Sequence, residues 1–416
     1  MQLKMKIKWK KIIVVFIMVF LIAFNSSFVF SNSDDSEPTL TAKAAILIDN
    51  RTNKILYGKN ENQKMYPAST TKIVTAILTI ENANLDDTVT ASYDAVMSIP
   101  DGYSTADIQI GENLTVEQLL EVLLVHSAND AANVLAEYIG GSIDSFVSMM
   151  NTKVHELGLE NTHFTNSYGK HDDDHYTTAY DLAKIMQYCI QNETFRKIAG
   201  QASCAIPATN MHDPRLYTST NELLLPNSKF YTSSLTAGKT GYTSQSGECL
   251  VSSSYQDNLE LICVILGCSK DSNNRFTETK KLYDYGYSTY SVQDVVKEND
   301  VGTQIEVSNA TKETKNLDLL VKETIPALVK NSESSQELSP EITLQEEISA
   351  PIEEGTILGK ITYTIQGVQY STDLIASHNV EKSKAFEYAI YTSILIIFLV
   401  LVICKIKDKL TNFRAR

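Results

Sequence analysis

The apolar residues of this 416-residue chain change their spacing twice, and this change constrains the fold more than any other feature. Residues 44–60 read as a hairpin, with an apolar strand, a polar turn and a second strand, and the region that follows repeats its apolar residues at helical spacing. Residues 234–243 return to a strand pattern, a hairpin follows around 255–258, and residues 275–290 form a final helix. We therefore predict an α+β fold in which strands from both ends form one antiparallel sheet with helices packed on it.

The middle of this region carries clear helix signals. Pro67 and the Ser-Thr pair after Ala68 precede an apolar run, which predicts a helix that opens at Ser69. The apolar spacing predicts further helices over 115–125, 129–138, 142–158 and 178–192. Glycines at 140, 141 and 158 are expected to end two of them.

Both ends of the chain combine apolar and basic residues. Residues 1–31 contain five lysines, no acidic residue and the apolar run 12–24, which is typical of a signal peptide cleaved after Ser31. Residues 388–404 are uncharged, and basic residues follow in 405–416. This pattern predicts a transmembrane anchor with a cytoplasmic tail, and therefore an exported body on the extracytoplasmic face. The alternatives are an uncleaved N-terminal anchor and, at the C-terminus, a core helix or a helix on the membrane surface.

A second exported region is expected between the first domain, residues 38–293, and the anchor. Residues 294–378 contain short strand-like runs rich in Glu, Thr, Val and Ile, which predict a small all-β domain. No cluster of chemically reactive residues occurs in it. We expect a spacer that holds the first domain away from the membrane, although the sequence is equally compatible with a binding role.

The charge and the cysteines exclude some classes of protein. The formal net charge of −14 argues against nucleic acid as a partner. Of the six cysteines, Cys404 lies in the expected anchor, and the remaining five cannot all pair. No Cys-x-x-Cys occurs, so we expect buried free thiols rather than a zinc site or a redox motif.

Three short motifs in the first domain carry the candidate chemistry. Ser69 and Lys72 lie three residues apart at the expected helix start, so both side chains are on one face. Alone this spacing is weak evidence, because Ser69 could simply cap the helix. Ser127 and Asn129 lie between two expected helices, and the run Lys239-Thr240-Gly241 lies on the strand after the helical region.

The side chains of these motifs suit nucleophilic catalysis. A serine hydroxyl is a weak nucleophile until a base removes its proton. Lys72 can be that base if burial and a second cation, such as Lys239, favour its neutral form. Ser127 can then pass a proton to the leaving amine, and Asn129 can orient Lys72 or a substrate amide.

The same motifs also offer binding groups. The helix start at Ser69 has free backbone N–H groups near a developing oxyanion. Lys239 and Thr240 suit a substrate carboxylate, and Gly241 leaves room for a substrate backbone against the strand.

Ser-x-x-Lys, Ser-x-Asn and Lys-Thr-Gly, in this order, are the three motifs of penicillin-recognising serine enzymes. The runs YPASTTKIVTA, HSANDAANVLAE, HYTTAYDLAKI, GKTGYTSQSGECLVSSS and APIEEGTILGKITY together resemble the serine D-alanyl-D-alanine carboxypeptidases, the low-molecular-mass penicillin-binding proteins. The resemblance covers about residues 40–378. It implies the β-lactamase/transpeptidase-like fold and the family's C-terminal β domain.

The resemblance also implies an activity. This is hydrolysis of the terminal D-Ala-D-Ala bond of peptidoglycan stem pentapeptides through an acyl-enzyme on Ser69, with acylation by β-lactams. It further implies an oxyanion hole formed by the backbone N–H groups of Ser69 and Tyr242. No metal or cofactor is expected. The family often has an amphipathic anchor lying on the membrane, from which the apolar run 388–404 departs.

Other activities use the same motifs. A class A β-lactamase also needs a deacylating acid in Glu-x-x-Leu-Asn, and the nearest run here, at Glu222, has Pro226 in place of Asn. Transpeptidation, endopeptidase action on cross-links, and a catalytically silent protein that binds the wall or senses penicillin remain alternatives. The run KHDDDHYTTAYD at 170–181 suggests a metal, but its spacing suits no preformed site, so we expect a solvated loop with Thr177 or Thr178 capping the next helix.

Overall fold

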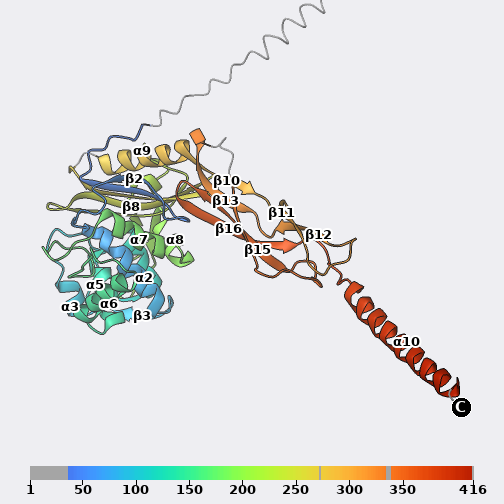
Figure 1. Ribbon diagram of the computed structural model, residues 1–416. Helices are drawn as coiled ribbons and strands as arrows, with labels where there is room; N and C mark the ends of the chain where they lie inside the picture. The colour runs from blue at the N-terminus through green and yellow to red at the C-terminus, as the bar shows by residue number, and fades with distance from the viewer. Residues whose placement is uncertain (1–35, 271–272, 334–338, 415–416) are drawn as a thin grey trace, which may run out of the picture. The chain divides into compact units, whose positions relative to one another are not determined.

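A central antiparallel sheet organises the larger part of the protein, as seen in a computed structural model that describes residues 36–270, 273–333 and 339–414 (Figure 1). The signal peptide predicted over residues 1–31 lies outside the described residues. The strand order is β2-β1-β9-β8-β7, so the hairpin from the start of the region pairs with strands from its end, as predicted. These strands are β1 (Ala44–Asp49), β2 (Ile55–Lys59), β7 (Leu235–Thr243), β8 (Gly247–Gln256) and β9 (Leu259–Cys268).

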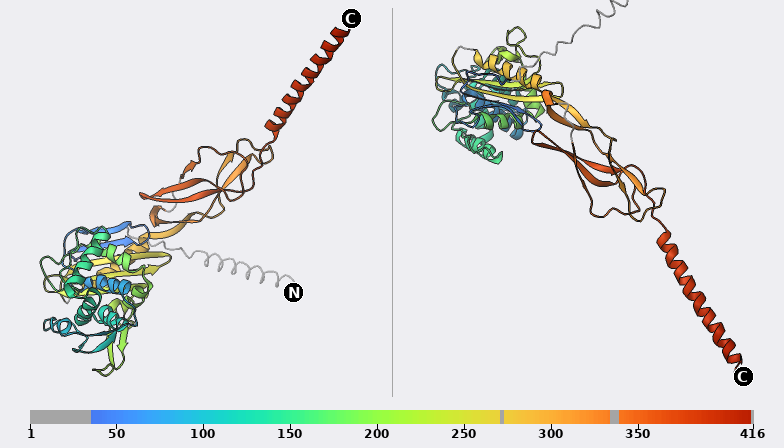
Figure 2. Two further views of the ribbon diagram at one scale, coloured as in Figure 1. Left: turned by 90° about the horizontal axis from the view of Figure 1, so that it is seen from below. Right: turned by 45° about the horizontal axis from the view of Figure 1, so that its top comes forward.

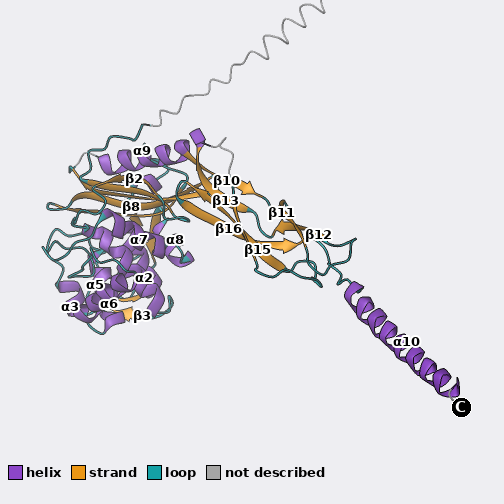
Figure 3. Cartoon of the chain, in the orientation of Figure 1, coloured by secondary structure: helices purple, strands orange, loops and turns teal. Residues whose placement is uncertain are grey.

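The sheet is covered on both faces, which explains why its inner strands are apolar without alternation. In β1, Ile46 and Ile48 belong to the core shared with the helical cluster, whereas Leu47 belongs to the core on the opposite face. That opposite face is covered by α9 (Asn274–Thr289), whose Leu282 and Tyr283 are buried there. The three layers are visible in Figures 2 and 3, with α9 on one side of the sheet and the helical cluster on the other.

The helical cluster is built from elements that the sequence predicts, together with two short helices that it does not. Thr115 caps its helix with a capping box, and Gly141, at φ +72°, ends another. The short helices α3 and α8 were not expected. The helices are α2 (Lys72–Asn82), α3 (Tyr93–Met97), α4 (Val116–Glu121), α5 (Asn129–Gly140), α6 (Ile143–Glu156), α7 (Ala179–Cys189) and α8 (Glu193–Ala199).

Two small two-stranded ribbons are a further difference from the sequence prediction. One pairs β3 (Thr88–Thr90) with β4 (Asn113–Thr115), and the other pairs β5 (Ser203–Ile206) with β6 (Arg215–Thr218). Strands of three or four residues are too short to show a clear alternation, so their pairing depends on contacts made elsewhere.

The C-terminal β region has its own core. Its main sheet has the order β11-β12-β16-β15-β14, and its buried side chains form a separate apolar cluster. The boundary expected at residue 294 falls inside β10, which begins at Tyr290 and pairs with β13. The strands are β10 (Tyr290–Val296), β11 (Val301–Glu306), β12 (Asn316–Val321), β13 (Ile325–Lys330), β14 (Glu341–Leu344), β15 (Ile357–Ile365) and β16 (Val368–Ala376).

The chain continues into α10 (Ala385–Arg414), a helix of 30 residues. Its stretch Ile390–Lys407 is long and apolar enough to cross a membrane, and among the described residues it is the one helix that meets this test. The expected buried free thiols are confirmed for the five cysteines outside this helix, which are Cys189, Cys204, Cys249, Cys263 and Cys268.

Candidate active site

The nucleophile candidate lies on a tight turn. The helix expected to open at Ser69 begins with a 3₁₀ turn over Ala68–Thr71 and continues as α2. Neither segment has a side-chain cap, so Ser69 does not serve the capping role considered from the sequence. Instead, Lys72 Nζ lies 2.8 Å from Ser69 Oγ. This is the contact that a base and its nucleophile require.

Lys72 lies in an unusual environment for a lysine. Its side chain is 0% exposed, and its ammonium also donates to Asn129 Oδ1 (2.6 Å) and to the carbonyl of Tyr168 (2.8 Å). Burial lowers the pKa of Lys72 well below its usual value, and repulsion from Lys239 lowers it further, whereas Asp130 raises it. The neutral amine is therefore accessible at a much lower pH than in an exposed lysine.

Ser127 and Lys239 form the second half of the site. Ser127 follows a π-helical turn and has φ +69°, a left-handed conformation that a serine rarely adopts. Lys239 Nζ donates to Ser127 Oγ (2.9 Å) and to the carbonyl of Thr240 (2.8 Å). Burial, followed by repulsion from Arg275, lowers the pKa of Lys239 to about 7.

These groups surround one cleft of about 530 Å³. Of the residues singled out from the sequence, six line it: Ser69, Ser127, Asn129, Thr240, Gly241 and Tyr242. Lys72 and Lys239 are not among its lining residues and reach the cleft through the serine hydroxyls that they contact. The sequence reasoning missed Arg275, which lines the cleft from the first turn of α9. No local pattern marks this arginine, because its position depends on how α9 packs on the sheet.

Two glycines let backbone segments meet beside the nucleophile. A Cβ on Gly241 would lie 2.9 Å from Ser69 N, and a Cβ on Gly169 would lie 1.9 Å from the carbonyl oxygen of Ala68. Asn166 orders the second segment, because its Oδ1 accepts hydrogen bonds from the backbone N–H groups of Gly169 (2.8 Å) and Lys170 (2.9 Å). The loop that supplies a carbonyl to Lys72 is thus held against the turn that carries Ser69.

The run of histidines and aspartates at 171–175 divides between the surface and the interior. Asp172, Asp173 and Asp174 are exposed, whereas His175 is buried beside Thr71. In the part of the chain that the structure describes, no group of three or more His, Cys, Asp or Glu side chains is arranged to hold a metal ion. Thr178 caps α7 by accepting from the N–H of Asp181 (2.9 Å), as the sequence predicts.

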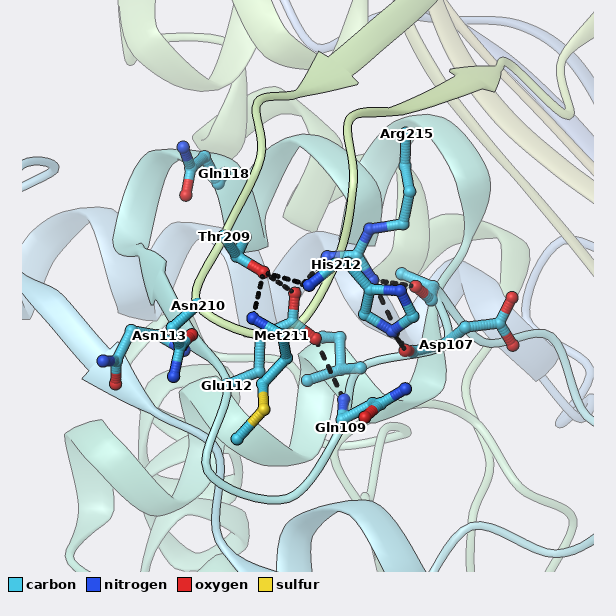
Figure 4. Close-up of polar contacts among 12 residues, drawn as sticks. Asp107, Gln109, Glu112, Asn113, Gln118, Thr209, Asn210, Met211, His212 and Arg215 are labelled. Atoms are coloured by element: carbon cyan, nitrogen blue, oxygen red, sulfur yellow. Dashed lines mark hydrogen bonds and ion pairs between the residues drawn. The ribbon is translucent and has the colours of Figure 1, made fainter.

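A polar cluster lies beside the β5–β6 hairpin (Figure 4). It supports the loop whose Ser104 lines the cleft. Glu112 is fully buried and pairs with the guanidinium of Arg215. Arg215 Nη1 also donates to the carbonyl of Ala106 (2.8 Å). Ser104 belongs to the same loop as Ala106, and its carbonyl accepts a hydrogen bond from the N–H of Asn129 at the start of α5 (2.9 Å). The cluster therefore connects the hairpin to the start of α5, where Asn129 contacts Lys72.

The fold and this geometry define a class of protein: a serine enzyme of acyl-transfer type with a lysine beside its nucleophile. The family model described as D-alanyl-D-alanine carboxypeptidase, peptidase S11, matches residues 31–270, and that of the penicillin-binding protein 5 C-terminal domain matches residues 290–382. The D-alanyl-D-alanine carboxypeptidase DacF of Bacillus subtilis is 32% identical over 356 residues, which cover 84% of this chain and 88% of DacF. DacC of Escherichia coli is 29% identical over 366 residues, 84% of this chain and 86% of DacC.

Solved structures agree with this result. Penicillin-binding protein 5 of Haemophilus influenzae superposes with a TM-score of 0.66 at 27% identity, over 83% of this chain and 99% of that one. A peptidoglycan synthesis regulatory factor of Streptococcus pneumoniae, PBP3, superposes with a TM-score of 0.68 at 28% identity. The match covers 83% of this chain and 100% of that one. The chain belongs to the D-alanyl-D-alanine carboxypeptidase family of serine hydrolases and has the penicillin-binding protein fold.

Proposed function

We propose that this protein removes the terminal D-alanine from peptidoglycan stem pentapeptides through an acyl-enzyme on Ser69, and that β-lactams acylate the same oxygen. One observation carries the proposal: the fully buried Lys72 has its amine 2.8 Å from Ser69 Oγ. Neutral Lys72 takes the hydroxyl proton while Ser69 Oγ attacks the carbonyl carbon of the penultimate D-alanine. The C–N bond then breaks, and the leaving amine receives a proton from Ser127, which Lys239 holds by a hydrogen bond and which takes over the proton that Lys72 removed. Lys72 is then neutral again. It takes a proton from water while the water oxygen attacks the ester carbonyl, and it returns this proton to Ser69 Oγ as the ester bond breaks and the peptide acid leaves.

The oxyanion of each tetrahedral intermediate is held by the backbone N–H groups of Ser69 and Tyr242. Two features support this role for Tyr242. Strand β7 is at the edge of its sheet. The N–H of Thr243 turns toward Ser246 in the β7–β8 turn (2.9 Å), so the N–H of the preceding residue points to the open side of the strand. Gly241, where a Cβ would lie 2.9 Å from Ser69 N, lets β7 lie against the turn that carries the nucleophile.

The substrate carboxylate is bound by Thr240 and Arg275 at the end of the cleft. Arg275 lines the cleft, whereas Lys239 is 1% exposed and already donates to Ser127 and to the Thr240 carbonyl. A guanidinium suits a carboxylate because it offers paired donors. Lys239 contributes charge from behind this end of the cleft, in addition to its contact with Ser127.

We expect Arg275→Gln to lower kcat/KM for a peptide ending in D-Ala-D-Ala by about 10- to 100-fold, the range for loss of a charge-assisted hydrogen bond. Most of the loss should be in KM, since the carboxylate is bound equally in the ground state and the transition state. Lys270→Gln is the matched control, because Lys270 is an exposed cation whose Nζ lies 5.6 Å from the ring of Tyr242, although Lys270 is not among the residues that line the cleft. Equal KM values for Arg275→Gln and the wild type would rule out this role.

The reaction is tested by incubating the purified chain with diacetyl-L-Lys-D-Ala-D-Ala and measuring released D-alanine. A cross-linked dimeric muropeptide and a chromogenic cephalosporin are assayed in parallel. Release of D-alanine with slow cephalosporin turnover supports the carboxypeptidase. Rapid cephalosporin turnover indicates a β-lactamase, and cleavage of the dimer alone indicates an endopeptidase. No product from any of the three substrates indicates a catalytically silent binding protein. Glu222, the residue nearest to a β-lactamase deacylating acid in sequence, instead accepts from Ser228 (2.9 Å) and is not among the residues lining the cleft.

The protein is exported by residues 1–31 and held at the membrane by residues 388–404, with residues 405–416 in the cytoplasm. The stretch Ile390–Lys407 of α10 supports this arrangement, since none of it is buried against the rest of the protein. We expect the full chain to stay in the membrane fraction after alkaline carbonate washing, and a chain truncated after Lys384 to become soluble. Carbonate release of the full chain would instead indicate a helix lying on the membrane surface.

A further inference from the structure

His175 is buried next to the nucleophile turn, although it lies in a loop that the proposed reaction does not use. It is 1% exposed, and its ring lies between residues of two segments. Nδ1 is 3.0 Å from the backbone nitrogen of Thr165, and Nε2 is 2.9 Å from Thr71 Oγ1. Thr71 itself is fully buried in the turn that contains Ser69.

These contacts determine where the imidazole proton lies. A backbone N–H can only donate, so Nδ1 of His175 must be the acceptor from Thr165. In the neutral ring, the proton is then on Nε2 and is donated to Thr71 Oγ1. The Thr71 hydroxyl in turn donates to the carbonyl of Ala68 (2.8 Å). The result is a directed chain of hydrogen bonds from the loop to Ala68.

The carbonyl at the end of this chain belongs to the peptide unit that also contains the Ser69 N–H. In a trans peptide the C=O and the N–H point in opposite directions, so fixing the Ala68 oxygen aims the Ser69 N–H. This peptide needs support, because Ala68 has φ +49°, a conformation that is costly for a residue with a Cβ. Its oxygen is also in close contact with Gly169.

The charged and titratable groups around His175 leave its ring neutral. Burial lowers its pKa to about 3, and His163, His171 and Lys72 also lower it, whereas Asp172 raises it. Because protonation of Nδ1 would oppose the Thr165 N–H, the neutral ring keeps this series of hydrogen bonds intact at neutral pH.

We infer that His175 is a positioning residue that acts through Thr71 to hold the Ala68–Ser69 peptide with its N–H aimed into the oxyanion hole. The inference rests on the proposed acyl-enzyme at Ser69. It predicts that interrupting this series of hydrogen bonds slows acylation without weakening substrate binding. Loss of one oxyanion donor lowers kcat by about 10²- to 10³-fold in other serine enzymes, and a misdirected donor should cost part of this.

The test uses two pairs of variants, one at each of the two side chains, Thr71 and His175, that form this series of hydrogen bonds. Thr71→Ser keeps the hydroxyl, whereas Thr71→Val removes it. His175→Gln places an amide N–H where Nε2 donates, whereas His175→Asn keeps only the acceptor for Thr165. Thr79→Val is the matched control, because Thr79 is equally buried in α2 and also donates to a backbone carbonyl (2.8 Å to Thr75). For each purified full-length variant, the acylation rate with benzylpenicillin, kcat and KM for D-alanine release, and the melting temperature are measured.

We expect Thr71→Val and His175→Asn to lower the acylation rate and kcat by about 10- to 100-fold with KM nearly unchanged. Thr71→Ser and His175→Gln should keep most of the wild-type acylation rate. Thr79→Val should lower the melting temperature without lowering the acylation rate. Acylation by Thr71→Val and His175→Asn at the wild-type rate would overturn the inference, as would losses that follow melting temperature alone. If Thr71→Val does not fold, the two His175 variants provide the test. Equal acylation rates of His175→Gln and His175→Asn would then overturn the inference. Failure of the wild type to form any adduct would instead overturn the proposed function.

Discussion

Replacing Ser69 by alanine is expected to abolish the covalent adduct with benzylpenicillin and to lower D-alanine release by about 10⁵- to 10⁶-fold, the scale seen when a nucleophilic serine is removed. The reason is that, among the hydroxyls of the described residues that line the cleft, Ser69 Oγ is the one in contact with the Lys72 amine. Ser127 also lines the cleft, but its oxygen accepts a hydrogen bond from Lys239 rather than from Lys72. Intact-mass spectrometry of the detergent-solubilised full chain, with and without benzylpenicillin, measures the adduct directly.

The control for this experiment is Ser148→Ala, which removes an exposed hydroxyl of α6 that donates to the carbonyl of Asp144 and to no residue of the three motifs. Ser148→Ala should form the adduct at the wild-type rate, and both variants should have circular dichroism spectra like that of the wild type. An adduct on a folded Ser69→Ala protein would show that another residue is the nucleophile, and peptide mapping would identify it. Absence of an adduct on the wild type would end the acyl-enzyme interpretation altogether.

Lys72→Met should have the second-largest effect, a loss of about 10²- to 10⁴-fold in the acylation rate, because it removes the general base while keeping a side chain of similar length. We expect the protein to stay folded. The change leaves the Asn129 and Tyr168 oxygens without their donor, but it also removes a fully buried ammonium, and the two effects on the free energy of unfolding oppose each other. Lys197→Met, at a 72% exposed side chain on α8, is the control and should have no effect on acylation.

The pH dependence of acylation gives an independent check on Lys72. The reactive form is the neutral amine, so the rate should rise as pH increases through the pKa of Lys72 and level off above it. Burial, together with repulsion from Lys239, holds that pKa well below its usual value, so the rise should occur far below pH 10.5. A stopped-flow acylation profile measures this. A rate that rises only near pH 10.5, or Lys72→Met acylating like the wild type, would contradict a general-base role.

The sequence determined much of this protein by itself. The change from strand to helix spacing and back predicts the five-stranded sheet and the helices packed on it, because each element needs only a few neighbouring residues to reveal its period. The Ser69–Lys72 contact is also local, since three residues bring the two side chains onto one side of a single turn. Capping at Thr115 and Thr178 and the helix stop at Gly141 depend on equally short stretches.

Only the tertiary structure decided how the site is completed. Lys72 reaches Asn129 across 57 residues and the Tyr168 carbonyl across 96, and Lys239 reaches Ser127 across 112. The motif order suggested that these side chains meet, but not that a backbone carbonyl would join them or that Arg275 would line the cleft. The burial that lowers the pKa of Lys72 likewise has no signal near that residue. Contacts between distant segments depend on which faces pack together, and the free energy of that packing is a property of the whole core rather than of any short stretch.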